Sequence, residues 1–87
     1  MKLEDNNIKL KFDSALKLHK EKNFLSAEKL YKDILISSPK HLGAIFHLGT
    51  LFAQIKRYTL AKELLLKAND LEPNNPNINL NLGNLFF

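Results

Sequence analysis

The sequence has no cysteine, which excludes a disulfide framework, a thiolate metal site and a cysteine nucleophile. It has only three glycines, and they do not form the glycine-rich loop that cradles phosphates. No stretch reaches the roughly 18 uninterrupted apolar residues of a membrane span, and residues 1–7 lack the apolar run of a secretory signal. We therefore expect a soluble, cytoplasmic protein with no membrane partner.

The excess of positive charge, +4 over 87 residues, raises the question of nucleic-acid binding, because clustered lysines release counterions from a phosphate backbone. Here, however, Lys9, Lys17 and Lys20 alternate with Asp13 and Glu21 along one predicted helix. Such alternation is typical of a solvated face with paired charges. We therefore predict no nucleic-acid partner.

The chain matches itself at an interval of 34 residues. The echoed pairs are Phe24 and Tyr58, Ala27 and Ala61, Pro39 and Pro73, Leu48 and Leu82, Gly49 and Gly83, and Phe52 and Phe86. A self-match at one fixed period identifies an array of stacked repeats rather than a single closed domain. The array divides into a polar lead (1–7), a first unit (8–41), a second unit (42–75) and the first helix of a third unit (76–87).

Apolar residues at helical spacing predict one hairpin from residues 8–21 and 24–36, and a second from residues 42–54 and 58–71. A proline closes each hairpin, because the residue before proline disfavours helix. After Pro76, apolar residues alternate with asparagines as they would in a strand. The repeat register favours helix there, since equivalent units adopt the same structure.

The second unit resembles the tetratricopeptide repeat. The matching residues are Ile45, Leu48, Gly49, Phe52, Ala61, Leu65, Ala68 and Pro73, with Ile45 where that family usually has Trp. The resemblance implies an all-α fold, a right-handed α-solenoid of antiparallel helix hairpins with about five helices in about two and a half repeats. We expect Gly49 and Ala61 at the closest approach of two helices, and Tyr31, Phe52 and Leu65 in the core.

In the tetratricopeptide family, the first helix of each repeat lines a concave groove. The corresponding residues here are Phe12, Asp13, Leu16, Phe46, His47, Thr50, Leu80, Asn81 and Asn84. Phe12, Phe46 and Leu80 form an apolar stripe that either receives a peptide or tucks into the core. Asn81 and Asn84 either hold the backbone of an extended chain, as in the similar repeats of O-linked N-acetylglucosamine transferases, or are ordinary solvated asparagines.

The family's carboxylate clamp for chaperone tails is not expected. Its positions hold Phe12, Leu16, His47, Asn77 and Asn81. None is a fixed cation, so a bound carboxylate would lack charge-assisted hydrogen bonds. The three histidines, His19, His41 and His47, show no metal-binding or catalytic spacing and are predicted to be surface or capping residues. We predict no catalytic residues, no cofactor and no metal.

The sequence stops halfway through a unit, and Leu85, Phe86 and Phe87 have no second helix to cover them. We therefore expect a truncated array or self-association into a homo-oligomer through these residues. The predicted function is protein or peptide interaction in the groove. The alternative is a substrate-recruiting or regulatory segment of a larger transferase, because the first unit is similar to N-terminal repeats fused to bacterial glycosyltransferases and sulfotransferases.

Overall fold

The computed structural model describes the backbone of residues 3–86 and the side chains of residues 7–83. Over this part the chain forms five α-helices: α1 (Leu3–Lys20), α2 (Phe24–Ser37), α3 (Leu42–Gln54), α4 (Tyr58–Leu71) and α5 (Pro76–Phe86). The all-α prediction is confirmed, and residues after Pro76 form a helix and not a strand. Pro76 is its first residue, where proline's missing N–H removes no intrahelical hydrogen bond.

The 34-residue period of the sequence is also a period of the backbone. The α1–α2 and α3–α4 turns place Lys22 and Lys56 in the left-handed region, with φ of 64° and 67°. A residue with this conformation ends a helix by reversing the chain direction. The helix ends repeat as well, because the Ser38 and Glu72 N–H groups donate to the carbonyls four residues earlier. The two hairpins are therefore built by the same local geometry.

The starts of α3 and α5 are capped at equivalent positions by different side chains. Nδ1 of His41 accepts a hydrogen bond from the Ala44 N–H at 3.0 Å. Thirty-four residues later, Oδ1 of Asn75 accepts from the N–H groups of Asn77 and Ile78 at 3.0 and 3.4 Å. Each cap satisfies backbone donors that the first turn of a helix leaves without a partner.

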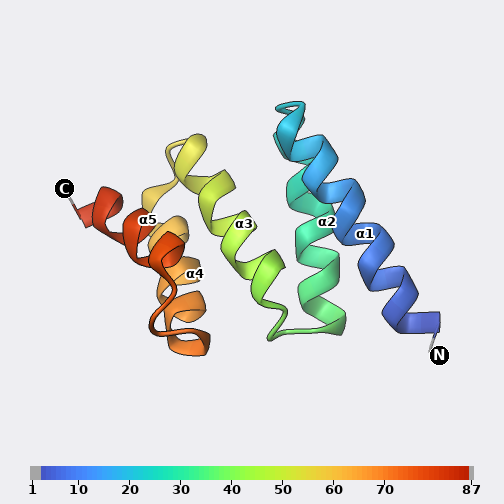
Figure 1. The fold of residues 1–87 in the computed structure, drawn as a ribbon. Coiled ribbons are helices and arrows are strands. Elements are labelled where there is room, and N and C mark those ends of the chain that lie inside the picture. The colour runs from blue at the N-terminus through green and yellow to red at the C-terminus, as the bar shows by residue number, and fades with distance from the viewer. Residues whose placement is uncertain (1–2, 87) are drawn as a thin grey trace.

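The helices follow one another along the molecule, from α1 and α2 at one end to α4 and α5 at the other (Figure 1). Each helix contacts the next in sequence, and α3 contacts both α1 and α5. Within the described residues, α2 and α4 make no such contact with each other. The helices α1, α3 and α5 thus form one closely spaced surface, which we call the odd-helix face. This packing is consistent with a helical repeat.

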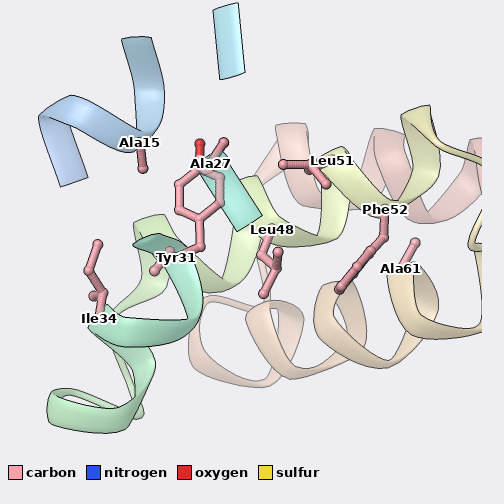
Figure 2. Close-up of a cluster of buried hydrophobic side chains, with 9 residues drawn as sticks. Ala15, Ala27, Tyr31, Ile34, Leu48, Leu51, Phe52 and Ala61 are labelled. Carbon is pink, nitrogen blue, oxygen red and sulfur yellow. The ribbon is translucent and has the colours of Figure 1, made fainter. Parts of the chain in front are cut away.

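Two clusters of buried side chains hold the array together. The first joins the α1–α2 hairpin to α3 and α4 through Ala15, Ala27, Tyr31, Ile34, Ala44, Leu48, Leu51, Phe52 and Ala61 (Figure 2). The second joins α3 and α4 to α5 through Ile45, Leu65, Ala68, Ile78 and Leu82. Tyr31, Phe52 and Leu65 are buried, as predicted for core residues. Burying each such side chain contributes about 1.5–3 kcal/mol to folding.

The two helices of the second hairpin approach each other closely at Gly49. A Cβ atom added to Gly49 would lie 3.0 Å from Cγ of Leu65, which is fully buried. A Cβ atom added to the equivalent Gly83 on α5 would meet no heavy atom of another helix within 4 Å among the described residues. The same residue type at the same repeat position therefore meets different packing in the two units.

Two predictions about α1 are wrong. The helix begins at Leu3 rather than Ile8, because adding residues to a helix that has already formed is favourable even without an apolar stripe. The expected charge pairs also do not form, because neither Lys17 nor Lys20 makes an ion pair in the described part of the chain. Exposed pairs of this kind contribute little, so nothing holds the lysines against the helix surface.

Candidate functional site

A cavity of about 670 Å³ opens where the end of α1 meets α3. Its lining comes from α1, the following turn, the first residue of α2, and α3. The residues are Leu16, Lys17, His19, Lys20, Lys22, Phe24, His47 and Gln54, and we call this the first cavity. Its volume lies within the roughly 300–1,000 Å³ range of ligand-binding pockets.

His19 joins three helices at the edge of the first cavity. Its Nε2 lies 2.5 Å from Oε1 of Gln54 on α3, and its Nδ1 lies 3.0 Å from the hydroxyl of Tyr31 on α2. The amide oxygen of Gln54 only accepts, so Nε2 carries the proton and donates to it. In the neutral ring Nδ1 then accepts from the Tyr31 hydroxyl. The three side chains thus form a chain of hydrogen bonds with one consistent direction.

Burial also changes the pKa of Tyr31. Burial raises the pKa of the Tyr31 hydroxyl to about 12, because a buried phenolate loses its hydration. Tyr31 therefore keeps its proton at neutral pH and stays a donor to His19. A tyrosine at this core position has a polar partner as well as an apolar ring, which is the usual arrangement for a buried tyrosine.

His47 lies at the centre of the odd-helix face and is half-buried. Its ring stacks on the ring of Tyr31, with centroids 6.3 Å apart and an interplanar angle of 11°. The rings of Phe12 and His19 lie 5.8 and 6.3 Å away. Burial, and secondly the neighbouring His19, lower the pKa of His47 below its ordinary value. Its imidazole is therefore held mainly neutral at neutral pH.

A second cavity of about 250 Å³ lies between the starts of α3 and α5. It is lined by Leu42, Gly43, Phe46, His47, Asn75, Asn77 and Ile78. His47 lines both cavities, so the two cavities adjoin each other at this residue. Apart from His47, the polar lining of the second cavity consists of asparagine amides, which both donate and accept hydrogen bonds.

Phe12 packs across the α1–α3 interface. Its ring lies 4.9 Å from the ring of His41, and a Cβ on Gly43 would lie 2.6 Å from Phe12 Cζ. The glycine thus allows α1 and α3 to approach with an aromatic ring between them. The apolar stripe is expected either to receive a peptide or to tuck into the core. Phe12 does the second, because its ring is half-buried against the first cluster.

The predicted groove residues are distributed unevenly. Leu16 and His47 line the first cavity, and Phe46 and His47 line the second. Phe12 packs across the α1–α3 interface, and Asp13 is exposed. Three further groove residues are turned to their own helices or to solvent: the Thr50 hydroxyl donates to the His47 carbonyl, the Asn81 amide donates to the Asn77 carbonyl, and Leu80 is 65% exposed. The side chains of Asn84, Leu85, Phe86 and Phe87 lie outside the described residues, so self-association through the last three stays a prediction.

Several lining residues were missed by the sequence analysis. The prediction for the histidines is confirmed for His41, which caps α3. His47, which is also predicted as a groove residue, is half-buried and lines both cavities. The prediction is incomplete for His19, whose two ring nitrogens both contact other helices. A signal was present, because His19 stands where the second unit has Ala53. A polar residue that replaces a small apolar one at a repeat position points to a local function.

Comparison with protein-family models and with curated protein sequences finds no match. Within residues 7–83 no three acidic or histidine side chains converge on a common point as metal ligands would. No helix of the described part is both long enough and apolar enough to cross a lipid bilayer. What the site does is therefore inferred from its own geometry.

Proposed function

We propose that this chain is a non-catalytic, tetratricopeptide-type interaction module that binds a peptide segment along its odd-helix face. The proposal includes the right-handed solenoid and the concave groove that the family resemblance implies. One observation carries it: the two cavities adjoin at His47, one beside the contact of α1 with α3 and the other beside the contact of α3 with α5. In a curved array the closely spaced helices form the inner, concave side, where partners bind.

The lining of the two cavities suits an extended peptide. Phe24 and Leu16 offer apolar contacts in the first cavity, and Phe46 and Leu42 offer them in the second. Between them His47 presents a polar edge. In grooves that bind extended peptides, apolar pockets separated by polar groups bind alternate side chains of the peptide.

The test is a selection of peptides from a random display library on the purified chain, followed by affinity measurement with the selected peptides. We expect Phe46→Ala and His47→Ala to weaken binding by about fivefold or more, because central contact residues dominate binding energy. Circular dichroism verifies that each variant is folded.

Matched controls lie on α2, away from the odd-helix face. Leu25 and Ile36 are 81% and 80% exposed, so Leu25→Ala and Ile36→Ala remove apolar surface of similar size outside the cavities. These variants are expected to bind as the wild type does. Binding that survives both groove substitutions and is lost with the α2 substitutions would refute the proposed site.

A further inference from the structure

The first cavity carries positive charge that no described lining residue offsets. Its charged lining residues are Lys17, Lys20 and Lys22, and no aspartate or glutamate among residues 7–83 lines it. None of the three lysines forms an ion pair in the described part of the chain. A cleft lined by charges of one sign concentrates ligands of the opposite sign.

The polar groups of this cavity divide into two sets. His19 and Gln54 are already hydrogen-bonded to each other. The ring nitrogens of His47 have no hydrogen-bond partner in the described part of the chain. The lysine ammonium groups and His47 are therefore the groups left to meet a ligand.

The surroundings of His47 determine how it responds to an anion. Two titratable side chains contact His47: His19 from α1 and Tyr31 from α2. Lys17, Lys20 and Lys22 line the same cavity, and His41 contacts the Phe12 ring that also contacts His47. None of them is acidic. A carboxylate bound among them would supply the missing opposite charge and favour the protonated imidazole.

The cavity also fits more than one carboxylate. Its volume of about 670 Å³ exceeds what a single small anion fills, and Leu16 and Phe24 provide apolar wall. A carboxylate on an aliphatic stem, repeated along a chain, matches three separate cations beside an apolar surface. This is the chemistry of glutamate side chains in a peptide.

We propose that the first cavity binds an internal acidic peptide segment, whose glutamate carboxylates lie among the three lysines and His47. The inference rests on the proposed peptide-binding function and adds the chemical class of the peptide. It differs from a clamp for a chain terminus, because the cations stand at the end of α1 and in its turn and not at the clamp positions.

The test uses fluorescence anisotropy with a short labelled peptide of alternating glutamate and leucine, acetylated and amidated so that no terminal charge contributes. A second peptide replaces glutamate by glutamine. We expect the glutamate peptide to bind about tenfold more tightly at low salt, with an advantage that declines as salt screens the charges.

Charge-matched variants separate the cavity from the overall charge. Lys17→Gln with Lys20→Gln should lower the affinity for the glutamate peptide about five- to tenfold. Lys29→Gln with Lys40→Gln removes the same charge from exposed lysines outside the first cavity, and should change the affinity by less than about twofold. Equal effects of the two pairs would overturn the proposal.

The pH dependence provides a second readout. Because the bound carboxylate favours protonated His47, binding takes up a proton and affinity rises as the pH falls from about 8 to about 6. In His47→Gln this rise should be lost. A wild-type affinity that is flat over this range would contradict the placement of a carboxylate beside His47.

The outcomes distinguish the two proposals. If glutamate and glutamine peptides bind equally and both lose affinity in Phe46→Ala, the acidic class is wrong and the peptide groove stands. If neither these peptides nor any display-selected peptide binds, the peptide groove itself is wrong. Binding of a labelled single-stranded oligonucleotide with the same dependence on Lys17 and Lys20 would also overturn the acidic-peptide assignment.

Discussion

The α1–α3 and α3–α5 interfaces follow the same 34-residue plan and differ in their chemistry. Tyr31 and Leu65 occupy equivalent positions and both are fully buried. The Tyr31 hydroxyl is hydrogen-bonded to His19, whereas the position equivalent to His19 in the second unit holds Ala53. His47 stacks on Tyr31, while its equivalent Asn81 bonds to its own helix.

This difference shows that the period preserves the packing positions and leaves the odd-helix face free to vary. Buried positions such as Ala27 and Ala61, and Leu48 and Leu82, keep a small or apolar side chain, because a change of volume there costs stability. On the odd-helix face the first interface has lysines and histidines and the second has asparagines. Binding specificity is therefore expected to lie in the residues that break the repeat.

The largest effect should come from giving the second interface the tyrosine of the first. Leu65→Tyr adds volume where Gly49 already approaches closely, and its hydroxyl would have Ala53 where Tyr31 has His19. We expect a loss of about 2–5 kcal/mol in the free energy of unfolding, from overpacking and an unsatisfied buried hydroxyl. Urea denaturation measures it, with Leu66→Tyr, at a 45% exposed site, as the control. A loss equal to that of the control would contradict this account.

The paired glycines should respond with opposite signs. Gly49→Ala is expected to destabilise the chain by about 1 kcal/mol, because the new methyl group would press on buried Leu65. Gly83→Ala enters open space and should stabilise α5 by about 0.5–1 kcal/mol, since alanine favours helix. Thermal or urea unfolding of both variants gives the signs. Equal signs would show that the close packing at Gly49 is not what distinguishes the two units.

Removing the Tyr31 hydroxyl should make the first interface as apolar as the second, with a small loss in the free energy of unfolding. Tyr31→Phe deletes the bond to His19 and should lower the free energy of unfolding by about 0.5–1.5 kcal/mol. Tyr58→Phe, at a half-exposed tyrosine, should change it by much less. A double-mutant cycle with His19→Ala isolates the coupling between the two side chains. Additive effects would mean that the bond contributes nothing to stability.

The smallest expected effect is a decrease in the free energy of unfolding at acidic pH, caused by His47. The pKa of His47 is lower in the folded chain than in the unfolded one because of burial and the neighbouring His19. Below about pH 6.5, the ordinary pKa of histidine, the unfolded chain therefore binds more protons than the folded chain. Stability should therefore be fully present above about pH 6.5 and decrease as the pH falls. His47→Asn, which copies the second interface, should reduce this decrease in equilibrium unfolding. An unchanged pH dependence would assign the effect to other groups.

The helices were predictable wherever apolar periodicity is strong. The bounds of α3 and α4 match the predictions to the residue, because each helix buries a regular stripe. The start of α1 was not predictable in this way, because residues 3–7 lack the apolar spacing that marks a helix and extend one that has already formed.

The site was predictable only in part. His47, Leu16 and Phe46 follow from their place in the repeat, and they do line the cavities. The bond between His19 and Gln54 spans 35 residues and depends on how side chains point across a helix interface. No pattern within a single unit encodes that direction.

The position of α3 has a consequence for how the molecule unfolds. This helix contacts the other four helices of the described part, and α1 and α2 reach α4 and α5 only through it. An array of separate units opens unit by unit from its ends. Here, loss of α3 would leave two helix pairs with no shared core, so we expect its amide hydrogens to exchange with solvent most slowly of all. The central helix thus sets the cooperativity of the chain.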